Sequence, residues 1–273
     1  MPIDLLIVEG NLDSEILAAV FQGSPAVRRG GPKNSLKPQA RYERERNGVE
    51  AGYVRDRDFD YEPPDDCSVV VVDSMINNLP LGWHWARHEI ENYLLDPGII
   101  ESAIGITERD WSQLITDVAG QIRWYQIARW TIGQVRRSLP PHYELETRPA
   151  GIKNELQLPD STDEPNSREW CLASIREFAA RFEGYTFSDN IEANLDGRSR
   201  AISEKCLSDA ASALIGCSGK DLLAGLPADV LDHAGFGNAG ELRAALRDWV
   251  RANAKEAIDH FPEWQSLLKQ VRE

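Results

Sequence analysis

Two stretches decide the fold: Leu5-Leu6-Ile7-Val8-Glu9-Gly10-Asn11-Leu12-Asp13 and Asp56-Arg57-Asp58-Phe59-Asp60. The first is typical of a short apolar strand, Ile3 to Val8, that ends in a carboxylate and is followed by a Gly-Asn turn and a helix. The second follows a strand-like run, Ala51 to Val54, and has acidic residues at alternate positions. Carboxylates at the ends of neighbouring strands supply the hard oxygen ligands that Mg²⁺ and Mn²⁺ prefer. Together the two stretches predict a site that holds such an ion against a phosphate.

Two other interpretations of the second stretch can be tested on the sequence. An EF-hand calcium loop that begins at Asp56 needs Gly at its sixth position and Glu at its twelfth. This chain has Tyr61 and Cys67 there, which excludes the EF-hand. A phosphatase motif of the haloacid-dehalogenase type would have Thr or Val in place of Asp60 and no preceding Glu-bearing strand. That alternative is weakened but stays open.

The first 96 residues alternate between strand and helix patterns, which predicts an α/β fold with a mainly parallel sheet flanked by helices. Ligands of such sheets bind at the carboxyl ends of the strands, where Glu9, Asp56 and Asp58 fall. Asp73 also follows an apolar run, although a turn or capping role is the stronger interpretation for it. The predicted strands span 3–8, 51–56 and 68–73 (the last buried on both sides), with an extended piece at 83–88, and the helices span 12–22 and 34–47.

Helical patterns dominate beyond Asp96-Pro97-Gly98, so we expect a catalytic domain over residues 1–96 and a largely helical region over 97–273. Part of that region could pack back onto the first domain. A capping signal at Thr107 predicts one long helix that ends at Pro140-Pro141. Its interleaved aromatic and arginine residues could stack on nucleic acid, but aromatic residues at helical spacing more often belong to a core. Residues 146–168 are typical of a loop.

A third acidic string, Ile90-Glu91-Asn92-Tyr93-Leu94-Leu95, follows the two opening motifs. Taken in order, Glu9, then Asp56 and Asp58, then this string resemble the TOPRIM domain of topoisomerases, primases and the overcoming-lysogenization-defect nucleases. The third string is similar to that of a TOPRIM-like branch in bacterial defence systems, which includes the ATPase-paired effectors of PARIS-type anti-phage systems. The resemblance covers residues 3–95, with a weaker echo at Gly219-Lys220-Asp221.

The resemblance implies a metal-dependent endonuclease that cleaves DNA or RNA with Mg²⁺ or Mn²⁺, as a toxic effector of anti-phage defence. It implies Glu9 as a metal ligand or general base, Asp56 and Asp58 as the ligand pair, and Lys220 as a lysine that stabilises the transition state. Glu91 is preferred over Glu89 as a further ligand, and if this segment is helical only one of the two should point inward. The auxiliary metal ligands are expected to be Asp13 and Asp60. The alternative is a catalytically weak TOPRIM-like subunit that mainly binds a partner ATPase or a phosphorylated ligand.

Gly219-Lys220 does not belong to a P-loop, because Leu214 stands where that motif needs Gly and Asp221 where it needs Ser or Thr. We therefore expect any ATPase activity to come from a partner protein. Two histidines, His84 and His88, could act as acid or base groups. Such residues more often pack or satisfy a strand end.

The net charge of −14 argues against a protein that coats nucleic acid by electrostatics alone. Residues 28–46, however, carry seven basic residues against two glutamates. This segment could meet phosphates or be a solvated helix face with paired charges, and both interpretations stay open. The acidic remainder favours a partner with a basic surface. The expected nucleic-acid contacts are Arg28, Arg29, Lys33, Lys37 and Arg41.

The composition, with 42% hydrophobic and 27% charged residues, is that of an ordinary globular protein. No apolar run approaches the about 18 residues of a membrane span, and Met-Pro-Ile-Asp lacks the basic leader of a signal peptide. We expect a cytoplasmic protein without membrane contact, and a possible homodimer when active. The dispersed cysteines are expected to be reduced thiols: Cys67, Cys171, Cys206 and Cys217.

Overall fold

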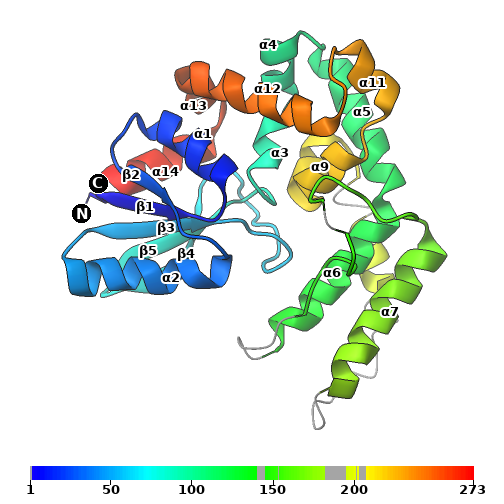
Figure 1. Cartoon of the computed structure of the whole chain (residues 1–273), viewed down its shortest axis with the longest axis horizontal. Helices are drawn as coiled ribbons and strands as arrows, with labels where there is room; N and C mark the ends of the chain where they lie inside the picture. Colours follow the sequence, from blue (N-terminus) through cyan, green and yellow to red (C-terminus); the bar gives the residue numbers. More distant parts are fainter. Residues whose placement is uncertain (1, 140–144, 153, 182–194, 201, 203–206) are drawn as a thin grey trace.

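The computed structural model describes residues 2–139, 145–152, 154–181, 195–200, 202 and 207–273 (Figure 1). The expected helix stop at Pro140-Pro141 and the thiol of Cys206 lie outside these residues. The other three cysteines are free thiols, and Cys171 and Cys217 are buried.

The N-terminal part is built on a five-stranded sheet with the strand order β2-β1-β3-β5-β4. β1 pairs in parallel with β2 and β3, and β3 pairs in parallel with β5, whereas β4 is antiparallel to β5. The predicted α/β fold with a mainly parallel sheet is therefore confirmed. The strands are β1 (Leu5–Val8), β2 (Ala26–Arg29), β3 (Ala51–Arg55), β4 (Val71–Ile76) and β5 (Leu79–His84).

Helices cover both faces of the sheet, as the apolar sequence of β1 requires (Figure 1). Leu6 and Val8 point into a core shared with α1 (Asn11–Phe21) and α14 (Pro262–Arg272). Ile7 points to the opposite face, where it packs with Leu36 and Ala40 of α2 (Lys33–Tyr42). A π-helical turn, Glu43–Asn47, extends α2 and completes the predicted 34–47 segment.

The prediction of a strand at 68–73 buried on both sides is wrong. β4 begins at Val71, lies at the edge of the sheet, and leaves Val72 and Met75 41% and 54% exposed. The reason is a hairpin: Asn77 and Asn78 both adopt positive φ, at 50° and 63°, between the antiparallel β4 and β5. Asn tolerates that backbone and favours this two-residue turn, so the chain folds back instead of crossing over the sheet.

The remainder of the described chain is largely helical, as predicted. The expected long helix from 107 to 139 is, however, two helices, because the chain leaves helical geometry at Ile122. The second of them, α6, extends away from the sheet side by side with α7 (Figure 1). The helices are α3 (Glu91–Leu94), α4 (Pro97–Ile104), α5 (Glu108–Gln121), α6 (Arg123–Arg137), α7 (Glu164–Arg181), α9 (Ala210–Gly216), α10 (Gly219–Ala224), α11 (Ala228–His233), α12 (Ala239–Ala252), α13 (Ala254–His260) and α14.

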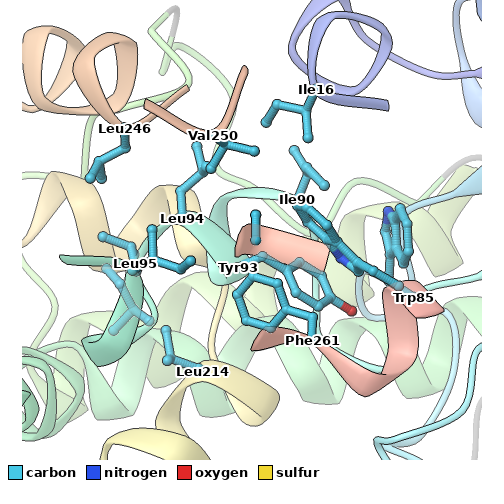
Figure 2. Close-up of a cluster of buried hydrophobic side chains, with 14 of the residues drawn as sticks. Ile16, Trp85, Ile90, Tyr93, Leu94, Leu95, Leu214, Leu246, Val250 and Phe261 are labelled. Atoms are coloured by element: carbon cyan, nitrogen blue, oxygen red, sulfur yellow. The ribbon is translucent and has the colours of Figure 1, made fainter. Parts of the chain in front are cut away.

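One hydrophobic core joins the sheet to these helices. Ile16 of α1, Trp85 after β5, and Val250 of α12 meet in it (Figure 2). A second cluster lies between α6 and α7, where Trp130 is 1% exposed and packs as core. The division into 1–96 and 97–273 stays a prediction. No helix of the described residues combines the length and apolarity needed to cross a membrane.

Candidate metal centre

Acidic side chains from three adjacent parallel strands converge at one edge of the sheet. Glu9 directly follows β1 and Asp56 directly follows β3, and these strands are neighbours. The chain that leaves β5, on the other side of β3, carries Glu89 and Glu91. The carboxyl ends of parallel strands open onto the same side, which is why residues this far apart in sequence meet. They border a cavity of about 640 Å³ whose lining includes Glu9, Asp13, Asp56, Glu91, Lys220 and Arg243.

Glu9, Asp13 and Asp56 form the floor of this cavity. Glu9 Oε1 accepts a hydrogen bond from the Asp56 backbone amide at 3.1 Å, and Asp13 Oδ2 accepts one from the Gly10 amide at 3.1 Å. Gly10 is the N-cap of α1, so Asp13 is held in the first turn of that helix. Asp56 Oδ1 is buried, and no described residue gives it a hydrogen bond.

These three carboxyl groups resist ionisation. Burial, followed by the charge of Asp58, raises the pKa of Glu9 to about 8, although Lys33 and Arg55 oppose the shift. Burial, then Asp13 and Glu9, raise the pKa of Asp56 well above its ordinary value. Burial raises the pKa of Asp13 as well. Crowded carboxyls behave in this way when no added cation offsets their mutual repulsion.

Lys220 reaches the same site from the start of α10. The hydroxyl of Ser218 caps this helix by accepting from the Asp221 amide, and Asn92 Oδ1 accepts from the Gly219 amide at 3.2 Å. A Cβ on Gly219 would lie 2.7 Å from the Asn92 nitrogen, so only glycine allows this approach. Burial would lower the pKa of Lys220, but Glu89, Glu91 and Asp56 raise it well above its ordinary value, which keeps the ammonium charged.

Glu89 and Glu91 both face Lys220, at 2.7 and 3.4 Å from its Nζ. The expectation that only one of them points inward assumed a helix through both residues. That condition is not met, because Glu89 lies in the irregular segment before α3 and Glu91 is the first residue of that helix. Burial raises the pKa of Glu91 to about 7, against the pull of Lys220. Burial also acts on Glu89, but Lys220 and His88 outweigh it and lower its pKa to about 2. Arg243 of α12 adds a second cation, 3.1 Å from Glu91 Oε1.

Asp58 lies beside this cavity, in a left-handed backbone conformation with φ of 49°. Its Oδ2 accepts from Lys33 Nζ at 2.7 Å, and its Oδ1 is 4.0 Å from His88 Nδ1. Burial raises the pKa of Asp58, but Lys33 and His88 lower it below its ordinary range. Asp58, His88 and Glu89 each offer one ligand atom, and these three atoms lie within 4.8 Å of one another. They form a possible buried metal-binding group.

The other residues of the Asp56–Asp60 stretch have structural partners. Arg57 is fully buried and donates to the carbonyl of Ala86 at 3.0 Å. Asp60 pairs with Lys33 at 2.6 Å and also with Arg55 and Arg136. Three cations already surround the Asp60 carboxylate, so its expected role as an auxiliary metal ligand has little support in this geometry.

Four of the seven basic residues of the 28–46 segment line one cavity along α2, namely Lys33, Lys37, Arg41 and Arg46. The other three do not line it. Arg28 pairs with Glu43 at 2.8 Å, which matches the alternative of a helix face with paired charges. Arg29 lines the cavity next to Glu9, and Lys33 turns toward Asp58 and Asp60. The cavity along α2 has a volume of about 630 Å³.

Some residues of the site had little or no sequence signal. Arg243 lies on an ordinary amphipathic helix, and nothing in its spacing distinguishes it from neighbouring arginines. Asn92 was visible only as part of the Ile-Glu-Asn string, yet it anchors the loop that carries Lys220 and also donates to the Cys217 carbonyl at 2.9 Å. His88 had no signal that separates a ligand from a packed histidine.

Comparison with protein-family models gave no match, and comparison with curated proteins gave none either. The class of protein therefore rests on the fold and the site. The chain has an α/β domain with a mostly parallel five-stranded sheet flanked by helices. The carboxyl edge of that sheet carries the acidic cavity and the possible Asp-His-Glu metal group.

Proposed function

We propose that this chain is a TOPRIM-like, metal-dependent endonuclease that hydrolyses phosphodiester bonds in DNA or RNA. The observation that carries the proposal is the convergence of Glu9, Asp56 and Lys220 on one cavity from separate parts of the chain. Carboxylates alone could be structural, but six of them line this cavity together with a charged lysine and three arginines. Such a mixture suits a phosphate that is bound together with a cation.

The residues of the cavity fit Mg²⁺ or Mn²⁺. Their donors are carboxylate oxygens, which both ions prefer, and Asp56 Oδ1 is a buried oxygen without a partner among the described residues. Glu9, Asp13, Asp56 and Glu91 would hold the ion. A bound divalent cation would polarise the scissile phosphoryl group and stabilise the leaving oxygen.

The basic side chains account for the rest of the chemistry. Lys220 stays charged, lies 3.4 Å from Glu91, and lines the cavity, so its ammonium can stabilise negative charge on a phosphate in the transition state. Arg29 and Arg243 line the same cavity and can orient the phosphate through paired N–H donors. Lys37 and Arg41 would contact the nucleic-acid backbone farther along α2.

The biological role that we propose is that of a toxic effector of anti-phage defence, acting in the cytoplasm and paired with an ATPase. It is supported by the resemblance of the three acidic motifs and by the absence of a P-loop in the sequence. The acidic net charge of −14 favours a partner with a basic surface.

A cleavage assay tests the catalytic proposal. Purified chain is incubated with supercoiled plasmid and, separately, with total tRNA, each with Mg²⁺, Mn²⁺ or EDTA. We expect cleavage of one substrate that requires the metal and is lost in Glu9→Gln and Asp56→Asn. The matched control is Asp248→Asn, an exposed carboxylate on α12 outside the cavity. Cleavage that persists in EDTA or in both site variants would contradict the proposal.

One observation favours the alternative of a catalytically weak subunit that binds a partner ATPase or a phosphorylated ligand. The chain's own cations already neutralise several of the carboxylates: Lys33 pairs with Asp58, and Lys220 pairs with Glu89. Carboxylates that are already paired with lysines have a weaker tendency to bind a metal ion. The alternative predicts no cleavage of either substrate with either ion, but retention of the chain by its partner.

A further inference from the structure

We propose that Asp58, His88 and Glu89 form a second cation site, distinct from the carboxylate cavity, in which the His88 imidazole is a direct ligand and which therefore prefers Mn²⁺ to Mg²⁺. The inference deepens the proposed function, on which its catalytic meaning rests, but the binding itself can be measured without any cleavage. It is argued from the environment of His88.

His88 is a fully buried polar side chain that has no hydrogen-bond partner among the described residues. It is 0% exposed, and among the described residues neither ring nitrogen takes part in a hydrogen bond. A buried polar group in this state destabilises the folded protein. A packed histidine would normally satisfy at least one nitrogen, so one of these nitrogens is open to a ligand that the described residues do not supply.

The geometry points to an ion as that ligand. His88 Nδ1 is 4.0 Å from Asp58 Oδ1, too far for a hydrogen bond. Two donors at about 2.1 Å from a shared ion lie at most about 4.2 Å apart, which matches this separation. The ligand atom of Glu89 lies within 4.8 Å of the other two, so a shift of some tenths of an ångström brings all three into range.

The surroundings hold His88 in this orientation. The ring of Phe59 packs edge-on against the imidazole, with centroids 4.3 Å apart, and Trp130 packs behind Phe59 at 5.1 Å. The Asp58 amide donates to the His88 carbonyl at 3.0 Å, which ties the two ligands together through the backbone. Apolar packing that fixes a ring while leaving its nitrogens free is what a preorganised ligand requires.

Each carboxylate of the group is also oriented by one lysine. Lys33 contacts Asp58 Oδ2 and leaves Asp58 Oδ1 on the His88 side. Lys220 Nζ contacts Glu89 Oε2, while Glu89 Oε1 accepts from Ser218 Oγ and from the Lys220 amide. Carboxylate oxygens have two lone pairs each and can accept a metal in addition. These contacts therefore fix the orientation of both carboxylates.

The donor set determines the selectivity. Mg²⁺ requires near-octahedral oxygen ligands and is reluctant to exchange water for nitrogen. An imidazole with two carboxylates suits first-row transition ions better, and Mn²⁺ is the member of that series closest to Mg²⁺ in its tolerance of carboxylate. We therefore expect this group to bind Mn²⁺ more tightly than it binds Mg²⁺.

Pulsed electron paramagnetic resonance of Mn²⁺ bound to the full chain tests the inference directly. We expect the spectrum of the wild-type chain to show a ¹⁴N coupling from a ligated imidazole. When the protein is labelled with ¹⁵N-histidine, a ¹⁵N coupling should replace it. Labelling needs no substitution, so this test does not depend on a variant that folds. Absence of nitrogen coupling in the wild-type chain, or no Mn²⁺ binding at all, would overturn the inference.

Variants of His88 test whether its imidazole supplies the nitrogen that couples to Mn²⁺. His88→Leu keeps a similar volume among Phe59 and Trp130 and should lose the coupling and weaken Mn²⁺ binding about tenfold or more, with Mg²⁺ affinity little changed. His88→Gln serves if the leucine variant does not fold. The matched control is His84→Leu, which removes another buried imidazole that contacts the Trp85 carbonyl and stacks on Tyr61. Unchanged Mn²⁺ affinity in both His88 variants would count against the site.

Cleavage measured on the same samples separates this inference from the proposed function. Nitrogen coupling without any cleavage would support the metal site and contradict the endonuclease. Metal-dependent cleavage without nitrogen coupling, unaffected in His88→Leu, would support the endonuclease and overturn the His88 site.

Discussion

At the scale of single residues, the buried carboxyl groups in and beside the cavity differ in their state of ionisation. Glu9 has its pKa raised to about 8 by burial and by Asp58, so in the metal-free protein it is largely protonated at neutral pH. Asp58 has its pKa lowered by Lys33 and His88 and remains ionised. A cation that enters the cavity must therefore displace a proton from Glu9, whereas a cation that binds beside the cavity meets an Asp58 that is already ionised.

This contrast predicts the effect of removing the Glu9 charge. Glu9→Gln keeps an oxygen that can accept from the Asp56 amide and removes a group whose ionisation burial opposes. We expect metal-dependent cleavage to fall about 100-fold or more, while the melting temperature in EDTA at pH 8 holds or rises. Calorimetry in EDTA and the plasmid and tRNA assays measure the two effects. A large loss of stability in EDTA would mean that Glu9 is structural.

Asp58 illustrates a second property of single residues, backbone strain. Its φ of 49° lies in the left-handed region, which Asn tolerates and which costs a β-carbon-bearing residue such as Ala about 1–2 kcal/mol. We expect the free energy of unfolding in EDTA to be about 1 kcal/mol higher for Asp58→Asn than for Asp58→Ala, although both variants lose the charge. Urea denaturation of the two variants gives the comparison, and equal stabilities would argue against strain at this position.

At the scale of elements, helix α6 supports the acidic stretch after β3. A Cβ on Gly133 of α6 would lie 2.6 Å from both the Cβ and the carbonyl oxygen of Phe59. Because Phe59 follows Asp58 and packs on His88, displacement of Phe59 moves both candidate ligands. The helix therefore positions the site without contacting the cavity.

Gly133→Ala tests this support. We expect a loss of about 1–3 kcal/mol in unfolding free energy from the forced contact, together with weaker Mn²⁺ binding. The control is Gly120→Ala in α5, where no atom lies within 4 Å of the added Cβ. In that variant the better helix propensity of alanine should stabilise the protein by up to about 1 kcal/mol. If both variants behaved alike, α6 would have no special role.

Helix α14 contains a carboxyl group that makes stability depend on pH. Glu263 is 2% exposed, accepts from the Ala86 amide at 2.6 Å and bonds to Tyr93, and burial raises its pKa from 4.5 to about 7. The folded state therefore holds this proton more tightly than the unfolded state. The stability that Glu263 contributes is fully present below about pH 4.5 and is lost as pH rises to 7.

Glu263→Gln can keep both contacts and removes the titration. We expect it to be more stable than the wild-type chain at pH 8 by about 1–3 kcal/mol, with the advantage shrinking toward pH 5. Thermal melts across this range measure the difference between the two proteins, which cancels the other groups that titrate. A constant difference at all pH values would mean that Glu263 is already ionised in the fold.

Most elements were predictable from local patterns, and the failures have local causes. The apolar run of β1 and the Gly-Asn turn after it were clear, because strand and helix periodicities change sharply there. The position of β4 was missed since an apolar run of valines fits both a buried strand and the approach to a hairpin. The Asn77-Asn78 turn decided between them. The break at Ile122 has no Pro or helix-ending Gly to mark it, because Gly120 lies inside α5, so the sequence pattern does not reveal it.

At the scale of the whole molecule, the acidic edge was predictable from local patterns, Lys220 was expected only through the family resemblance, and Arg243 was not predicted. Glu9 and Asp56 could be brought together from strand order alone, since both follow parallel strands. Lys220 and Arg243 enter from helices more than 120 residues away from β5, through contacts such as that of Asn92 with Gly219. Local sequence patterns carry no information on contacts of that separation.

At the same scale, we expect the chain to associate with a partner protein. We expect the chain to be held by a larger ATPase encoded by a neighbouring gene, because an acidic protein with a nuclease-like site needs restraint. Co-expression and pull-down should recover the complex, and the free chain should be toxic and dimeric. A chain that is monomeric, fully active and harmless alone would contradict this regulation while leaving the site intact.

The shared core also bears on how the protein is made. The Ile3 amide donates to the Val271 carbonyl at 2.8 Å, and Trp83 Nε1 donates to Gln270 at 2.6 Å, so α14 completes the packing on β1 and β5. A ribosome adds about 5–20 residues per second. The first strand therefore waits tens of seconds for its covering helix, and the cavity lacks Lys220 and Arg243 for most of that time. The cavity is therefore complete only after α10 and α12 have been synthesised, and the packing on the sheet only after α14 has been added.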